Sequence, residues 1–192
     1  KAAAAEVNAG LGMLPKGVAK AVQTAANEVV RGEHDAHFPI DVYQTGSGTS
    51  SNMNANEVIA TLASRAGKAQ VHPNDHVNLG QSSNDVIPTA IRVAAQLAAV
   101  EDLLPAIGHL RKTVDAKGRA LGKVVKTGRT HLMDAMPLTF GQEFSAWSAQ
   151  LASAQARIED TLKRVRRLPL GGTAIGTGIN ADPRFGARVA KA

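Results

Sequence analysis

The chain has 192 residues, enough to bury a hydrophobic core, and its abundance of alanine with only 3% aromatic residues favours closely packed helices over a β-sandwich. It contains no cysteine, which excludes a disulfide framework and a cysteine-based metal site and favours a reducing, cytoplasmic compartment. The net charge of +6 is uneven: residues 1–100 carry 7 Lys and Arg against 8 Asp and Glu, and residues 101–192 carry 15 against 8.

The basic half of the chain lacks the other features of a nucleic-acid-binding protein. Its Lys and Arg residues are spread along helical segments, aromatic residues for base stacking are scarce, and no DNA- or RNA-binding motif is present. The chain has no run of about 18 apolar residues that would predict a membrane span, and Lys1 to Ala5 reads as the inside of a helix and not as a signal peptide. We therefore predict no nucleic-acid or membrane partner and a positive field that steers a small anionic substrate.

Short helices are predicted in the first part of the chain. Pro15 separates two of them, and Gly32 ends the second, as glycine commonly does after a helix. The segment 34–43 contains a proline and is too short for a helix, so we expect it to be extended. A third helix follows a glycine-containing loop and ends at Gly67, before another loop around Pro73. The predicted helices are 1–12, 16–31 and 53–66.

Two long amphipathic helices are predicted after these. One starts at Ser83, with Pro88 in its first turn and a kink at Pro105, because proline removes the hydrogen bond to the carbonyl of Glu101. The other follows Pro137 and has nearly heptad spacing. Helices of this length need long partners, so we predict a bundle core shared between copies of the chain, with a monomeric bundle as the alternative. The apolar stripes are Ala90, Val93, Leu97, Val100, Leu104, Ile107, Leu110 and Val114, and Phe140, Phe144, Trp147, Leu151, Ala154, Ile158, Leu162 and Val165.

The last part of the chain indicates a fragment. The glycine-rich turn 171–178 lacks the strand-to-helix context and the lysine of a phosphate loop. Asp182-Pro183 predicts the start of a new helix, yet the chain stops ten residues later and lacks an initiator Met. We predict an internal piece of an all-α protein, with an incomplete N-terminal domain over 1–80 and an incomplete central helical-bundle domain over 81–192.

Three short stretches rich in hydroxyl and amide side chains lie beside predicted helices. Their near lack of net charge is the profile of a surface that holds a small anion. At a helix start, free backbone N–H groups and the positive end of the macrodipole attract anions. Two such starts in one small chain suit a substrate with two carboxylates. The stretches are Gly46–Asn54, His72–Asp75 running on to Gln81–Asp85, and Gly128–His131.

The two helix starts supply the candidate anion-binding side chains. For the second start, the alternative interpretation is that one serine and Asp85 merely cap the helix. The hydroxyls are interpreted as binding groups and not as nucleophiles, because no serine–histidine–acid pattern is present. The candidates are Ser47, Thr49, Ser51, Asn52, Ser82, Ser83 and Asn84.

A histidine in the third stretch, in Thr130-His131, could move protons near neutral pH; a hydrogen-bonded loop histidine is the alternative. His72 could form a weaker anion pocket with Asn74 or simply order its loop. The other four histidines are expected at the surface. No two histidines stand at ligand spacing on one helix, so no metal site is predicted. The four are His34, His37, His76 and His109.

These motifs together carry a resemblance. The segments Gly46-Ser-Gly-Thr-Ser-Ser-Asn-Met-Asn-Ala-Asn-Glu57, His72-Pro-Asn-Asp75, Gln81-Ser-Ser-Asn-Asp85, Gly128-Arg-Thr-His-Leu132 and Pro137-Leu-Thr-Phe-Gly-Gln-Glu143 resemble class II fumarase, in matching order along the whole chain. Class II fumarase belongs to the fumarase/aspartase superfamily of largely helical homotetramers. Aspartase is the nearest competitor, but its patterns place Ala where Ser47 stands and Thr where Ser83 stands.

The resemblance implies reversible, cofactor-free anti addition of water across fumarate to give L-malate, through a carbanion stabilised as its aci-carboxylate. It implies that His131 handles the proton of the water that adds or leaves. It also implies a second, peripheral anion site at His72, Asn74 and Asp75. The residues implied to hold the substrate carboxylates are Ser47, Thr49, Ser82, Ser83, Asn84 and Thr130.

Parts of the family pattern are absent from the chain. The mobile Gly-Ser-Ser-x-Met-Pro-x-Lys-x-Asn loop, which supplies the base, and the acidic partner of the histidine would both lie beyond Ala192. The spacer between Arg65 and His72 is short, and the arginine that some members place before the second site is not evident. The fragment alone is therefore expected to be inactive.

The resemblance also predicts how the active site is assembled, and two other functions compete with the predicted activity. Because the family builds each active site from three subunits, we expect Gly46–Asn54 to be one wall, with Ser82–Asn84 and Thr130–His131 supplied by neighbouring chains. The competing functions are an aspartate ammonia-lyase and a non-catalytic helical assembly module.

Overall fold

The computed structural model describes residues 1–41, 43–44, 46–67 and 70–192. Val42, which belongs to the segment predicted to be extended, lies outside these ranges. The chain divides into two compact units, described in turn. Unit 1 comprises Lys1–Ile91 and Leu168–Ala192, and unit 2 comprises Arg92–Arg167.

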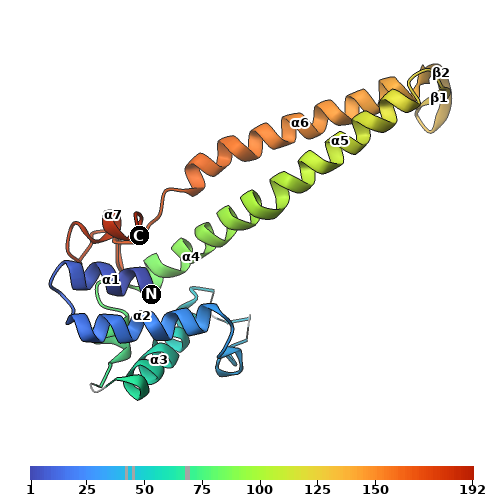
Figure 1. The fold of residues 1–192 in the computed structure, drawn as a ribbon. Helices are drawn as coiled ribbons and strands as arrows, with labels where there is room; N and C mark the ends of the chain where they lie inside the picture. The colour runs from blue at the N-terminus through green and yellow to red at the C-terminus, as the bar shows by residue number, and fades with distance from the viewer. Residues whose placement is uncertain (42, 45, 68–69) are drawn as a thin grey trace. The chain divides into compact units, whose positions relative to one another are not determined.

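Three helices and a short turn form most of unit 1: α1 (Ala2–Gly10), α2 (Lys16–Val30), α3 (Thr49–Ala66) and η2, a π-helical turn at Pro73–Val77 (Figure 1). Alanines at the contacts let the helix backbones approach closely, and Val22 and Ala63 have no exposed surface. The predicted break at Pro15 and the predicted glycine after the second helix are confirmed, with Gly32 at φ +76°. The core comprises Ala5, Leu14, Ala19, Val22, Ala25, Ala26, Ile59, Ala60, Ala63, Val71 and Val77.

Two predictions for this unit are wrong in detail. Asp35–His37, within the segment expected to be extended, forms a 3₁₀ turn, η1. Helix α3 begins at Thr49 and not at residue 53, because Gly48 takes a left-handed conformation at φ +71° that turns the chain directly into the helix. The polar stretch therefore lies within the first turns of α3 as well as before them.

Helix α4 (Ser83–Ala98) continues through η3, a π-helical turn at Ala99–Leu103, into α5 (Leu104–Ala120). The π-helical turn ends at Leu103, two residues before Pro105, and the kink predicted at this proline stays a prediction. Pro88 is the sixth residue of α4 and so falls in its second turn, which corrects the expected placement in the first turn.

The connection between α5 and α6 (Phe140–Val165) is an antiparallel hairpin of β1 (Val125–Thr130) and β2 (Met133–Thr139). The all-α prediction holds for the protein as a whole but missed these strands. A register shift between Thr127 and Arg129 marks a bulge in β1. Figure 1 shows α5 and α6 side by side, with the hairpin joining their ends. Thr139 and Gln142 form a capping box that starts α6 where the sequence predicted it.

The chain ends in unit 1 with α7 (Phe185–Val189), whose Phe185 is fully buried beside Ala4 and Val7 of α1. The Asp182 carboxylate accepts a hydrogen bond from Arg184 N at 2.8 Å, but Arg184 is the N-cap of α7, so the helix starts two residues later than Asp182-Pro183 predicted. Among the described residues, no helix has the length and apolar character required to cross a membrane.

The compact units do not coincide with the predicted ranges 1–80 and 81–192. The first residues of α4 belong to unit 1 because Asp85 hydrogen-bonds to Gly171 and Thr173, which draws the glycine-rich turn to the same place. The division into an N-terminal and a central domain remains a proposal about the larger fold.

Candidate functional site

The structure brings two of the predicted polar stretches together within one chain. Asn52, in α3, donates from Nδ2 to the Ser83 hydroxyl at the start of α4, over 2.9 Å. A Cβ added to Gly48 would lie only 2.7 Å from the Ile87 side chain, so glycine is needed where these segments approach each other. The expectation that a neighbouring chain supplies the Ser82–Asn84 wall is therefore wrong, because this wall already contacts Gly46–Asn54 of its own chain.

The structure shows capping contacts at the start of α4, whereas anion binding there stays a prediction. The Ser82 hydroxyl accepts a hydrogen bond from Asn84 N at 3.2 Å, and the Asp85 carboxylate accepts one from Ser82 N at 2.9 Å, which are capping contacts. Ser83 does not take part in this cap. Asn84 donates from Nδ2 to the carbonyl of Ala174 at 2.8 Å, so one of its two amide hydrogens is committed to the glycine-rich turn.

Asp85 is the buried group that joins these segments. Only 2% of its surface is exposed, and its Oδ2 accepts hydrogen bonds from Gly171 N at 3.1 Å and Thr173 N at 2.8 Å. Thr173 adopts φ +57°, a strained conformation for a non-glycine residue. The carboxylate thus holds a strained turn against the start of α4, and the sequence analysis had considered it only as a cap.

The start of α3 offers hydroxyl groups beside the first free N–H groups of the helix. Ser47 Oγ lies 3.0 Å from Thr49 Oγ1, and Ser51 Oγ accepts a hydrogen bond from Gln44 Nε2 at 2.8 Å. Gly46 has φ +80° and allows the sharp turn that places Ser47 there. These residues form a neutral, donor-rich surface suited to a carboxylate.

Thr130 and His131 lie in unit 2, at the tip of the hairpin. Thr130 pairs with Met133, so His131 and Leu132 form a two-residue turn. Both have positive φ, +52° and +61°, as the central residues of a type I′ turn require, although this turn strongly favours Asn and Gly. Non-glycine residues held there cost about 1 kcal/mol or more each, so the turn is strained at His131 and Leu132.

Gly128 gives a direct test of how the hairpin positions this tip. A Cβ at Gly128 would lie 2.6 Å from the Met136 carbonyl oxygen across the strands. We expect Gly128→Ala to destabilise the hairpin by about 1–3 kcal/mol. Gly108→Ala is the matched control, because Gly108 lies within α5 with nothing within 4 Å of an added Cβ. Thermal unfolding of both variants makes the comparison, and an equal change in stability would refute the role of Gly128 in the hairpin.

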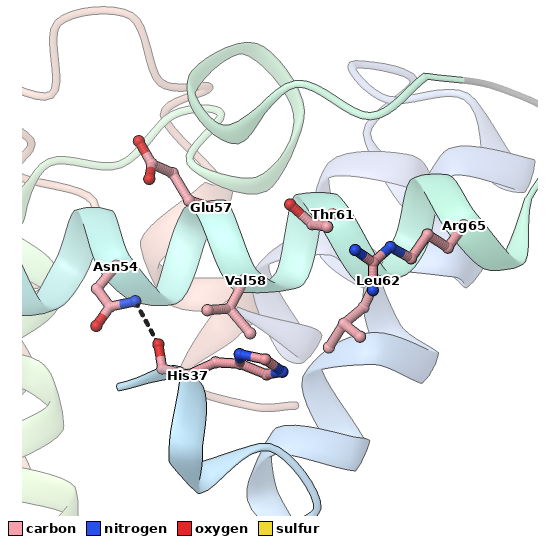
Figure 2. Close-up of a pocket in the computed structure, with 7 residues that line it drawn as sticks. All are labelled: His37, Asn54, Glu57, Val58, Thr61, Leu62 and Arg65. Carbon is pink, nitrogen blue, oxygen red and sulfur yellow. Dashed lines mark hydrogen bonds between the residues drawn. The ribbon is translucent and has the colours of Figure 1, made fainter. Parts of the chain in front are cut away.

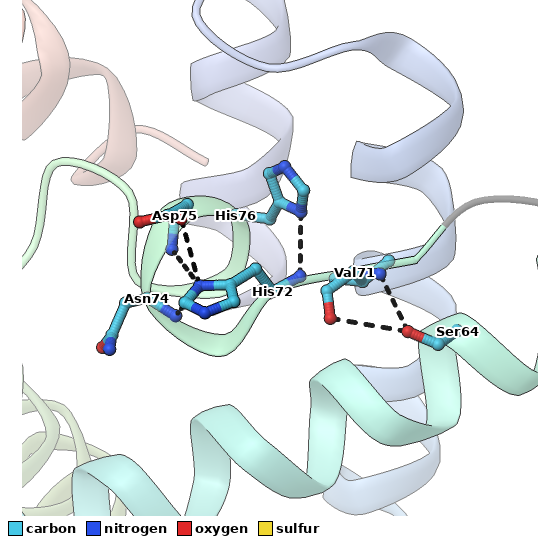
Figure 3. Close-up of polar contacts among 6 residues, drawn as sticks. All are labelled: Ser64, Val71, His72, Asn74, Asp75 and His76. Atoms are coloured by element: carbon cyan, nitrogen blue, oxygen red, sulfur yellow. Dashed lines mark hydrogen bonds and ion pairs between the residues drawn. The ribbon is translucent and has the colours of Figure 1, made fainter.

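The second stretch begins with His72, whose side chain caps η2 (Figure 3). His72 Nδ1 lies 3.3 Å from Asn74 N and 3.1 Å from Asp75 N, and also 3.2 Å from Asp75 Oδ2. One nitrogen cannot accept from amides and donate to a carboxylate at once. In the capping state Nδ1 therefore carries no proton, and Nδ1 can donate to Asp75 only when it carries one. An anion at His72, Asn74 and Asp75 would rely on Nε2–H and the Asn74 amide.

Two pockets lie along α3. One, of about 280 Å³, is lined by His37, Asn54, Glu57, Val58, Thr61, Leu62 and Arg65, and Figure 2 shows Asn54 donating to the carbonyl of His37. The other, of about 510 Å³, includes Val71 and Pro73 on either side of His72. None of the predicted substrate-binding residues lines either pocket, so these hollows do not mark the anion-binding surface.

One cluster has atoms placed as metal ligands could be. Ligand atoms of Glu28, Glu33 and His34 lie within 4.8 Å of one another. His34 Nε2, however, is already 3.1 Å from Glu28 Oε2, and Glu33 is paired with Arg31. These contacts already engage side-chain atoms that a metal ion would need as ligands.

Several polar residues near the anion-binding surface were not singled out from the sequence. Lys1, Asn78 and Gln81 form a hydrogen-bonded group next to Asn52 and Ser83. The only sequence signal was a lysine at the start of an alanine-rich helix, and such lysines usually lie in solvent.

Comparison with known proteins now defines the class. A family model described as lyase matches residues 1–192, so the chain belongs to this lyase family. The class II fumarate hydratase of Xylella fastidiosa (strain Temecula1) is 71% identical over 191 residues, covering 100% of this chain and 40% of that protein. The class II fumarate hydratase of Thermus thermophilus is 55% identical over 196 residues, covering 100% of this chain and 42% of that protein.

The solved structures agree in fold. Class II fumarase from Schistosoma mansoni has a TM-score of 0.92 and 41% identity, covering 98% of this chain and 40% of that one. A fumarate lyase/delta crystallin from Brucella melitensis has a TM-score of 0.83 and 40% identity, covering 99% and 44%. The resemblance to class II fumarase is confirmed, and the chain spans about two fifths of the length of these relatives.

Proposed function

We propose that the protein carrying these residues is a fumarate hydratase, which adds water reversibly to fumarate to give L-malate. The observation that carries this proposal is the joining of two neutral, donor-rich helix starts by the Asn52–Ser83 hydrogen bond. Donors aimed at a dicarboxylate stabilise it most where negative charge accumulates in the transition state. The similarity to class II fumarate hydratases supports the same activity.

The roles of the residues follow from the chemistry that each can offer. Hydroxyls and amides of Ser47, Thr49, Ser82, Ser83, Asn84 and Thr130 hold the substrate carboxylates. His131 handles the proton of the water that adds or leaves. His72, Asn74 and Asp75 form a second anion site, and the reaction uses no cofactor or metal.

The base that removes the carbon-bound proton is expected outside these 192 residues, because no Gly-Ser-Ser-x-Met-Pro-x-Lys-x-Asn motif occurs among them. The 192-residue chain alone should therefore leave fumarate unchanged, as measured by its ultraviolet absorbance. Robust hydration by this chain would refute the assignment of the base to another segment.

The active protein is proposed to be a homotetramer with a shared helix bundle, located in the cytoplasm. Four residues of the predicted stripe on α4, η3 and α5 are 43–49% exposed in the single chain: Val93, Leu97, Val100 and Leu110. Two long helices cannot bury such a stripe by themselves, so we expect further copies of the chain to pack against it. The absence of cysteine suits a reducing compartment.

The competing activity within the superfamily is ammonia addition to fumarate. An active protein carrying these residues is incubated with fumarate in water and, separately, with fumarate and ammonia. We expect malate in both and no aspartate. Aspartate formation without malate formation would replace the hydratase by an ammonia-lyase, and neither product would favour a non-catalytic assembly module.

A further inference from the structure

A chain of polar side chains runs from Lys1 to the Ser83 hydroxyl. Lys1 Nζ is 2.7 Å from Asn78 Oδ1 and 3.1 Å from Gln81 Oε1. Asn52 Nδ2 makes a longer contact of 3.4 Å to the same Asn78 oxygen and donates to Ser83 Oγ at 2.9 Å. All of these residues belong to unit 1.

The ammonium group sets the direction of every hydrogen bond in this chain. It can only donate, so Asn78 and Gln81 must turn their oxygens toward it. Their amide nitrogens then point the other way: Asn78 Nδ2 donates to the Gln81 carbonyl at 3.2 Å, and Gln81 Nε2 donates to the Val77 carbonyl at 3.1 Å. With the ammonium in place, the orientations of both amides are determined and mutually consistent.

The same argument determines the orientation of the Asn52 amide. Because Asn78 offers it an oxygen, Asn52 must present its nitrogen, which also reaches Ser83. Asn52 is 3% exposed, and its Oδ1 is buried with no hydrogen-bond partner among the residues that the structure describes. An orientation with that cost is imposed by its surroundings. The Ser83 oxygen accepts from Asn52, so the Ser83 hydroxyl proton is directed to another acceptor.

We infer that Lys1 is a positioning residue, which acts through Asn78 and Asn52 to keep the Ser83 hydroxyl oriented as a donor toward a bound carboxylate. The inference rests on the proposed function of Ser83. Lys1 itself does not touch the substrate. Its effect is to prevent the Ser83 hydroxyl from donating its proton to an acceptor inside the protein. If the hydroxyl donated inward, the lone pairs of the serine oxygen would face the anion.

The surroundings of Lys1 act on its charge in two opposite ways. Burial lowers the pKa of the Lys1 ammonium to about 7, while the negative charge of Asp85 acts to raise it. A desolvated ammonium interacts strongly with the few acceptors around it, because the local dielectric is low.

The test is Lys1→Met in an active protein carrying these residues, with fumarate as the probe. Methionine keeps the length and loses all donors, so Asn78 and Asn52 can reverse. We expect KM for fumarate to rise about tenfold, the effect of losing one hydrogen bond to a charged group, with kcat within about twofold. Lys20→Met, on the exposed surface of α2, is the matched control and should leave KM unchanged.

A double-mutant cycle separates positioning from a general loss of stability. If Lys1 acts through Ser83, Lys1→Met should add almost nothing to the KM of Ser83→Ala. Additive effects of the two substitutions, or an unchanged KM in Lys1→Met, would overturn the inference. Lys1→Arg, which retains a donor-only cation, should recover much of the affinity.

A second variant keeps the test valid if Lys1→Met does not fold. Asn52→Asp replaces the inward donor by an acceptor, so the Ser83 proton should turn inward and KM should rise as in Lys1→Met. A normal KM in folded Asn52→Asp would contradict the inference. A wild-type protein that does not hydrate fumarate would instead refute the proposed function, whereas normal wild-type kinetics with unaffected variants would refute only the role of Lys1.

Discussion

Replacing His131 by Asn is expected to lower turnover of fumarate about a hundredfold to ten-thousandfold, with a much smaller change in substrate binding. Asparagine tolerates positive φ better than histidine does, so the turn at φ +52° should remain intact or gain stability. The loss would therefore come from the missing proton-transfer group and not from a collapsed hairpin. Steady-state kinetics of an active protein carrying the substitution give kcat and KM separately.

The control for this variant is His109→Asn, at an exposed position in α5. It removes a histidine from the same unit without touching the hairpin tip, and it should keep full turnover. Unchanged turnover in His131→Asn would remove this residue from the mechanism, and an equal loss in both variants would point to a general effect on the unit.

The second large effect is expected for Asp85→Asn. One carboxylate oxygen accepts from Ser82 N and the other from Gly171 N and Thr173 N, whereas asparagine must turn an NH₂ group toward some of these donors. Buried donors left unsatisfied cost about 1–3 kcal/mol each, so we expect a loss of about 2–4 kcal/mol in the free energy of unfolding. Denaturant unfolding measures the total.

Hydrogen exchange measures the local effect of the same substitution on the glycine-rich turn. Exchange of the Gly171 and Thr173 amides should accelerate strongly in Asp85→Asn, because each loses its buried acceptor. Asp102→Asn, at an exposed position in η3, is the matched control and should change neither quantity. Wild-type protection at both amides in Asp85→Asn would show that the carboxylate does not hold the glycine-rich turn.

Apolar residues at helical spacing, and prolines and glycines at helix ends, made the helices predictable. The stripe from Phe140 to Val165 coincides with α6, and Pro15 and Gly32 bound α2 closely, since proline and glycine act on the local backbone. The hairpin was missed because its turn consists of His131 and Leu132 and not of Asn and Gly. The conformation of this turn is imposed by the pairing of β1 with β2. The spacing of apolar residues along the sequence does not reveal that pairing.

The candidate site was predictable in its composition but not in its connections. Hydroxyl and amide side chains at helix starts indicated an anion-binding surface from local chemistry alone. Which stretches meet depends on contacts between distant residues. Asn52 with Ser83, and Asp85 with Thr173, could not be paired from spacing. The Ser82–Asn84 wall was assigned to a neighbouring chain because the resembling family builds each active site from three subunits.

The most direct measurement mixes two impaired variants, Ser83→Ala and His131→Asn, by co-expression in an active protein carrying these residues. The account places Ser83 beside Asn52 of its own chain and His131 in the site of another chain. Random assembly then forms wild-type sites at about a quarter of positions, and fumarate hydration should return to a corresponding fraction of the wild-type rate. Hydration that stays at the level of the separate variants would contradict a shared dicarboxylate site built from these residues.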